Sequence, residues 1–213
     1  MHATELLSQW LAQHNVIQHG ARREAVRKLV EALLGGGKLS LTQLGRHRAG
    51  SAYPKHHIKA ADRLLGNVHL HRERQRIYRA LAQTVLAGVR RPVILVDWSD
   101  SDPGQRWYLL KAAVAVRGRA LSLYEKVYPL KDYNTPKAHR EFLQTLKTLL
   151  PEDCQPILIT DAGFRGPWFQ AVEALGWSWI GRILGQIKYY DEHKSRWQSI
   201  RALYPQATAR VRH

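Results

Sequence analysis

Apolar side chains in the first ninety residues recur at intervals of three and four, the spacing that places them on one face of a helix. Glycines break this pattern: Gly35, Gly45 and Gly66 each follow a periodic run, and helices commonly end at such residues. Pro54 stands where a first-turn proline is favoured. The pattern predicts five helices, at about residues 4–14, 21–34, 40–45, 54–65 and 71–88.

From Val93 onward the pattern is that of strands. The run from Val93 to Val96 is unbroken in apolar residues, which is typical of a strand buried on both faces. Helices are predicted to open at Pro136 and Pro167. The other predicted strands cover 107–116, 119–128, 157–159 and 177–183. With right-handed crossovers this β-β-β-α-β-α-β order predicts an α/β fold, a mixed sheet of strand order 3-2-1-4-5 as in the ribonuclease-H-like fold.

The chain is strongly basic, with 33 Lys and Arg against 17 Asp and Glu and a formal net charge of +16. Such an excess favours nucleic acid as a partner over an anionic membrane surface, or over a charge that only keeps the protein in solution. No apolar stretch reaches the roughly 18 residues of a membrane span, and the first residues lack the pattern of a signal peptide. Cys154 is the single cysteine, so no internal disulfide can form and we expect a cytoplasmic protein.

The basic excess is concentrated in the helical region, where residues 1–90 hold 15 Lys and Arg against 5 Asp and Glu. Two short helices joined by a glycine-containing break are typical of a helix-turn-helix, whose second helix would read DNA. The exposed face of that helix would carry four side chains suited to phosphates and base edges: Lys55, His56, Lys59 and Arg63. A plain helical bundle with a solvated basic face explains the same pattern, so both interpretations stay open.

Two of the predicted strands end on an aspartate, Asp97 and Asp161. In the predicted strand order these two strands are neighbours, about 4.8 Å apart, which brings the carboxylates together. Because Mg²⁺ prefers oxygen ligands, the pair predicts a divalent-metal site of the kind that acts on phosphodiesters. The alternative is that each aspartate only forms a turn or caps a helix. His139 is expected at the surface rather than as a ligand.

Four segments of the chain together resemble bacterial insertion-sequence DDE transposases: Val-Asp97-Trp-Ser, the stretch from Gly118 to Lys126, Lys137-Ala-His139, and Thr-Asp161-Ala-Gly-Phe-Arg. The resemblance is to the type-four insertion-sequence family, the group that includes the transposase of the transposon Tn-ten. It implies that Asp97 and Asp161 are the first two acids of a catalytic triad that holds Mg²⁺ or Mn²⁺. It also implies cutting and joining of double-stranded DNA at transposon ends, a homodimer in the paired-end complex, and a nucleoid-associated protein.

The third acid of that family lies on a helix far downstream, in a Tyr-Arg-Glu-Lys motif after an inserted β-rich segment. Nothing in this chain matches the motif, since the stretch from Tyr189 to Glu192 has neither its spacing nor its setting. We therefore expect the front part of a transposase. Its parts would be a DNA-binding region at 1–90, a partial catalytic core at 91–183, and the poorly ordered start of the inserted segment at 184–213.

Such a chain is expected to be catalytically poor alone, because two carboxylates hold a metal loosely without a third ligand. Two other functions stay open. One is a DNA-binding remnant or inhibitor without catalysis. The other is a self-sufficient ribonuclease-H-like nuclease, which requires a third acid close to Asp97 and Asp161.

Overall fold

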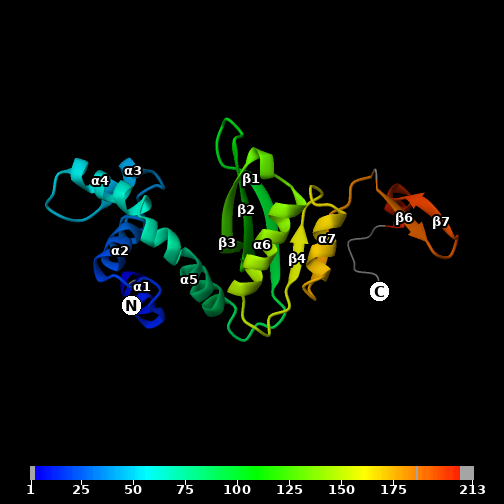
Figure 1. Cartoon of the computed structure of the whole chain (residues 1–213), viewed down its shortest axis with the longest axis horizontal. Coiled ribbons are helices and arrows are strands. Elements are labelled where there is room, and N and C mark those ends of the chain that lie inside the picture. The colour runs from blue at the N-terminus through cyan, green and yellow to red at the C-terminus, as the bar shows by residue number, and fades with distance from the viewer. Residues whose placement is uncertain (1–2, 186, 207–213) are drawn as a thin grey trace. The chain divides into compact units, whose positions relative to one another are not determined.

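A computed structural model describes residues 3–185 and 187–206 of the chain. Contacts within the chain divide it into two compact units, one ending at Val85 and the other beginning at Leu86. The first unit is helical, and the second is built on a mixed sheet (Figure 1). None of the helices in these ranges is long and apolar enough to cross a lipid bilayer.

The helical unit contains five helices in its described part: α1 (Ala3–His14), α2 (Gly20–Leu34), α3 (Leu41–His47), α4 (Pro54–Leu65) and α5 (Val68–Val85). Leu11, Val16, Ile17 and Ala80 form its buried cluster, because the apolar faces of α1 and α5 meet there. Helix α5 begins three residues before the predicted position. The cause is Asn67, whose side-chain Oδ1 accepts hydrogen bonds from the backbone N–H groups of residues 69 and 70 and so caps the helix.

Helices α3 and α4 pack closely at Gly45. A Cβ at this residue would lie 2.4 Å from a side-chain carbon of Ile58 and 2.6 Å from its backbone. The sequence predicts that Gly45 ends the helix, but α3 continues to His47 and Gly45 is buried within it. The glycine is therefore required by the approach of α4, rather than by the end of α3.

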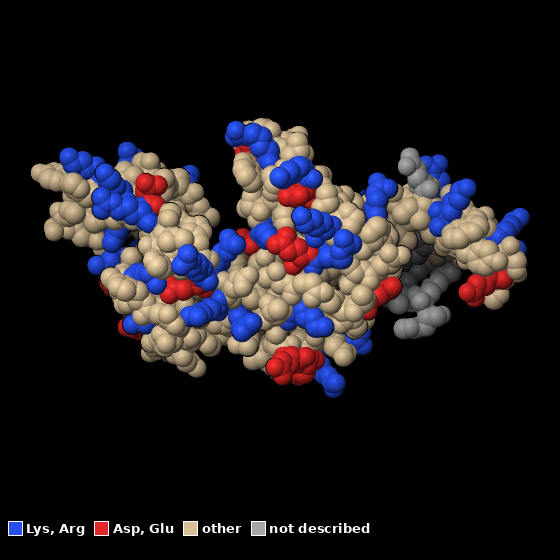
Figure 2. All heavy atoms as spheres, in the orientation of Figure 1, with Lys and Arg blue, Asp and Glu red and all other residues tan. Residues whose placement is uncertain are grey.

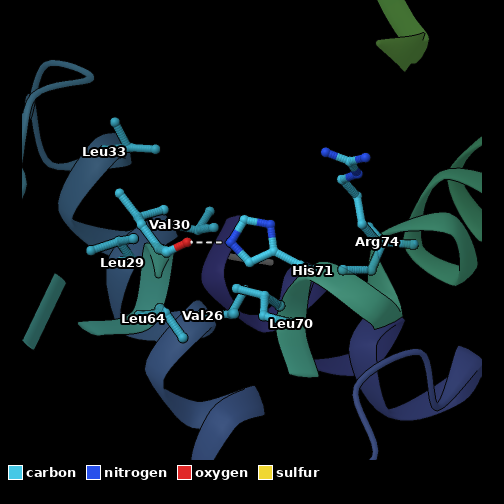
Figure 3. A pocket seen from close by; sticks show the side chains of 10 residues that line it. Val26, Leu29, Val30, Leu33, Leu64, Leu70, His71 and Arg74 are labelled. Atoms are coloured by element: carbon cyan, nitrogen blue, oxygen red, sulfur yellow. Dashed lines mark hydrogen bonds between the residues drawn. The ribbon is translucent and has the colours of Figure 1, made fainter. Parts of the chain in front are cut away.

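Helices α2, α4 and α5 surround an apolar pocket of about 320 Å³ (Figure 3). Val26, Leu29 and Val30 of α2 line it together with Leu70 of α5. The imidazole of His71 lies among these side chains and donates from Nε2 to the Leu65 carbonyl, with 2.6 Å between the two atoms. The apolar stripes of three helices thus face one another here without filling the space between them.

The second unit is organised around a five-stranded sheet of order β3-β2-β1-β4-β5, which confirms the predicted strand order. Strands β1, β2 and β3 pair antiparallel, whereas β4 lies parallel to both β1 and β5. This mixed α/β architecture is consistent with the predicted ribonuclease-H-like fold. The strands are β1 (Val93–Asp100), β2 (Trp107–Val116), β3 (Arg119–Pro129), β4 (Ile157–Thr160) and β5 (Ser178–Gly181).

Helices α6 (Pro136–Leu149) and α7 (Gly166–Glu173) pack against one face of this sheet (Figure 1). Tyr124 of β3 contacts Phe142 of α6 with 4.7 Å between ring centroids. Toward the opposite edge of the sheet, Phe169 of α7 packs on Trp179 of β5, with 4.0 Å between ring centroids. Large apolar side chains fill this interface, among them Ile94, Leu110, Leu143, Leu146, Leu158 and Trp168, each at most 1% exposed.

The opposite face of the sheet is open in the described part of the chain. Val93 and Leu95 of β1 point to it and are 39% and 38% exposed, and Ile180 of β5 is 55% exposed. The prediction that β1 is buried on both faces is therefore wrong. Its even-numbered residues, Ile94 and Val96, are buried beneath the helices, and its odd-numbered residues have no such cover.

The segment after the sheet folds as a hairpin. Strands β6 (Lys188–Asp191) and β7 (Arg196–Ser199) pair antiparallel, and the 3-10 helix η2 (Ile200–Gln206) follows. The last part of the segment expected at 184–213 lies outside the described residues, which end at 206. A further 3-10 helix, η1 (Leu130–Asp132), connects β3 to α6.

Candidate active site at the ends of two parallel strands

Asp97 lies within β1, and Asp161 directly follows the neighbouring parallel strand β4. In the register of β1 and β4, Val96 pairs with Thr160, and each aspartate is the next residue along its chain. Because side chains alternate along a strand, the Asp97 carboxylate points to the open face of the sheet, in line with Leu95. The structure thus brings together the two acids that the sequence singles out.

The two carboxylates affect each other electrostatically. Partial burial raises the pKa of Asp97, and the negative charge of Asp161 raises it further. A hydrogen bond from the backbone N–H of Trp98 acts in the opposite direction. Like charges held this close favour a proton or a cation between them, as a metal-binding pair does.

The turn after β4 fixes the orientation of Asp161. Its Oδ1 accepts a hydrogen bond from the backbone N–H of Gly163 at 2.9 Å, so the aspartate does form the turn that the alternative interpretation requires. A Cβ at Gly163 would lie 3.1 Å from the same oxygen. An ionised carboxylate can accept about four hydrogen bonds, so forming this turn is compatible with binding a metal as well.

The lysine directly across the sheet from Asp97 forms an ion pair with another acid. Lys111 of β2 lies directly across from Asp97 in the antiparallel register, and Glu125 of β3 lies across from Lys111. The Lys111 ammonium forms an ion pair with Glu125, with 3.3 Å between Nζ and Oε1. Glu125 thereby provides a counter-charge for Lys111.

Three residues beside the acids were not identified from the sequence. The side chain of Asn134 donates to the Gly163 carbonyl at 3.2 Å and so holds the turn that carries Asp161. Burial raises the pKa of Tyr133, and the charges of Tyr108 and Asp100, followed by those of Asp161 and Asp97, add to this shift. The third residue is His139. The sequence predicts it at the surface, but it is 3% exposed under the sheet.

The donor set suits a hard divalent cation. Two carboxylates on adjacent strands, with mutual repulsion that a cation would relieve, are ligands that Mg²⁺ and Mn²⁺ accept, and both ions retain several waters. Within residues 3–185 and 187–206, no group of three or more His, Cys, Asp or Glu side chains could hold a metal ion. The observation that would favour a self-sufficient nuclease is therefore missing from the described part of the chain.

The predicted DNA-reading side chains all lie on α4. Lys55, His56, Lys59 and Arg63 are each exposed. Spacings of four residues place Lys55, Lys59 and Arg63 along one side of the helix. Lys and Arg side chains are also spread widely over the face of the molecule shown in Figure 2, with Asp and Glu in smaller patches. The α4 residues belong to the helical unit and the acid pair to the sheet unit.

Comparison with known families gives a match for the second unit. The family described as the transposase DDE domain matches residues 89–212, which include both aspartates and the whole sheet. No curated protein and no solved structure matches the chain.

Proposed function

The chain belongs to the transposase DDE domain family, and from this we propose that Asp97 and Asp161 are the acids with which it cuts and joins DNA. The proposed substrate is double-stranded DNA at the ends of a bacterial insertion sequence of the Tn-ten-like group. The proposed assembly is a homodimer that pairs two such ends. The observation that carries the proposal is the pairing of Val96 with Thr160, the residues that directly precede Asp97 and Asp161.

The two aspartates would hold Mg²⁺, or Mn²⁺ in its place. A bound divalent ion of this kind makes water a stronger nucleophile and stabilises the oxygen that leaves a phosphodiester. The chain's own contribution is to orient the carboxylates. The parallel register fixes Asp97 beside Asp161, and the Gly163 and Asn134 hydrogen bonds hold the turn that carries Asp161. Asp97 projects from within β1, where a side chain is held more firmly than in a long loop, and Asp161 is the first residue after β4.

The helical unit would supply the affinity for DNA. The exposed side chains Lys55, His56, Lys59 and Arg63 are suited to phosphates and base edges, as the second helix of a helix-turn-helix requires. The close packing of α3 on α4 at Gly45 supports this interpretation, because it gives α4 a fixed orientation. Interactions with phosphates would dominate the affinity and make it sensitive to salt.

Cleavage and strand transfer on DNA that carries the ends of the source element would test the proposal. We expect at most weak metal-dependent nicking, which Asp97→Asn and Asp161→Asn each abolish and Asp153→Asn leaves unchanged. Asp153 is an exposed acid of the same unit and serves as the matched control. Nicking that persists in both Asp97→Asn and Asp161→Asn would refute the assignment of the acids.

A second function is favoured by one observation, the lack of a third metal-holding side chain among the described residues. With two carboxylates only, the chain would bind transposon ends and cut them poorly, and could inhibit a complete partner. The same assay separates the two functions. DNA binding without metal-dependent nicking, together with a lower cleavage rate when this chain is added to an active transposase, supports the binding function.

A further inference from the structure

We propose that His139 is a positioning residue, which holds the segments that carry Asp97 and Asp161 in place against each other. The proposal rests on the function proposed above, in which these two acids form one site. His139 lies near the start of α6, where its backbone N–H donates to the Thr135 carbonyl at 3.0 Å. Its side chain lies on the helix-covered side of the sheet, opposite the Asp97 carboxylate.

The first contact of His139 is with the residue after Asp97. The indole N–H of Trp98 donates to Nε2 of His139, with 3.2 Å between the nitrogens. Because side chains alternate along β1, Trp98 points toward α6 while Asp97 points to the open face. The two residues share a peptide unit, so a fixed indole also fixes the backbone from which the Asp97 carboxylate projects.

The second contact is with the segment after Asp161. Phe164 lies three residues beyond that acid and is 4% exposed. Its ring stacks on the imidazole of His139, with 5.3 Å between centroids and an angle of 24° between planes. Trp168 of α7 meets the same imidazole edge-on at 5.0 Å, which completes the enclosure of the ring. One imidazole therefore contacts both acid-bearing segments.

The protonation state of His139 fits this role. Its Nε2 can accept the indole N–H only if that nitrogen carries no proton. Burial lowers the pKa of His139 to about 4, so the ring is neutral near pH 7. A purely apolar ring such as phenylalanine would fill similar space and stack on Phe164. It would lack the acceptor for Trp98, and this difference separates positioning from simple packing.

The experiment measures Mn²⁺ affinity by titration calorimetry on the full chain, together with the melting temperature. We expect His139→Phe and Trp98→Phe each to weaken Mn²⁺ binding on the order of 10-fold, the effect of losing an outer support of a metal ligand. The double variant should be no weaker than either single variant, because both remove the same hydrogen bond. His139→Gln, which restores an acceptor, should recover most of the affinity. Trp107→Phe is the matched control, since Trp107 is 47% exposed on β2.

Unchanged Mn²⁺ affinity in His139→Phe, with only a lower melting temperature, would overturn the proposal and leave a packing role. If the wild-type chain binds no Mn²⁺, or Asp97→Asn binds it equally well, it is the proposed function that fails. In that case, amide NMR spectra recorded without metal test whether His139 positions the two segments. Broadened signals for residues 97–99 and 161–164 in His139→Phe, sharp again in His139→Gln, support positioning, and unchanged signals refute it.

Discussion

Asp161, the residue after β4, lies beside Asp97 of β1, and its negative charge adds to partial burial in raising the pKa of Asp97. A carboxyl whose pKa is raised by folding contributes stability at low pH, and this contribution is lost as the pH rises through the folded pKa. At neutral pH without metal, the pair of aspartates thus lowers the free energy of unfolding of the sheet unit. Functional sites commonly carry such a cost in stability.

The first prediction is that metal reverses the order of the melting temperatures of the wild type and Asp97→Asn. In EDTA at pH 7.5 we expect Asp97→Asn to melt above the wild type, because the repulsion from Asp161 is removed. In Mn²⁺ at about 100 times its Kd, the wild type gains about 2.7 kcal/mol and should melt above the variant. Thermal denaturation under both conditions measures this, with Asp153→Asn as the control. The same order of melting temperatures in EDTA and in Mn²⁺ would contradict the prediction.

The second prediction concerns acid and His139. Its pKa falls from an ordinary 6.5 to about 4 in the folded protein. Between these two pH values the unfolded chain therefore binds a proton that the folded chain does not bind. Stability should therefore fall as the pH falls from 6.5 to 4, by about 3 kcal/mol from this residue. Urea denaturation across this range would show a flatter pH dependence for His139→Phe. An equal slope in the variant would exclude His139 as the titrating group.

The third prediction tests the packing of α3 against α4. Gly45→Ala places a methyl group against the Ile58 backbone and should destabilise the helical unit by about 1 to 3 kcal/mol. Gly20→Ala is the matched control at the start of α2, because no atom lies within 4 Å of its added Cβ. Urea titration followed by helical circular dichroism measures both variants. Equal stability of the two would show that α3 and α4 lie further apart than described.

The fourth prediction concerns DNA. Replacing Lys55, Lys59 and Arg63 together by alanine should weaken DNA binding and lower the slope of log affinity against log salt by about 3, since each removed cation would have neutralised one phosphate. The control removes the same charge from α6, where Lys137, Arg140 and Lys147 are exposed. Fluorescence anisotropy from 50 to about 300 mM salt gives both slopes. If the two triple variants behave alike, α4 has no special role in binding DNA.

The strand order could be predicted because it follows from local patterns and one rule of chirality. Apolar runs marked the strands, Pro136 marked the start of a helix, and right-handed crossovers then placed β4 beside β1. The adjacency of Asp97 and Asp161 followed directly. The sequence could not predict whether one face or both faces of β1 are buried, because an apolar run such as Val93 to Val96 is compatible with either arrangement.

The supports of the candidate site depend on contacts between distant residues. His139 meets Trp98 across 41 positions of the chain, and Asn134 reaches Gly163 across 29. Neither residue stands out by spacing or composition. The aromatic residues that follow each acid, Trp98 and Phe164, were the available signal, since rings next to buried strands need partners. Gly45 was misinterpreted for the same reason, because Ile58 lies in the next helix.

The open face of the sheet has a practical consequence for handling the protein. Leu95, Val127 and Ile180 lie on it at 38%, 49% and 55% exposure, together with Trp107 of β2. We expect such a surface to bind hydrophobic dyes and to promote precipitation as the protein concentration rises. Sulfate would strengthen this tendency and modest urea would weaken it. Because of this exposed apolar face, we recommend purification buffers without sulfate and a fluorescent-dye titration as a check on sample quality.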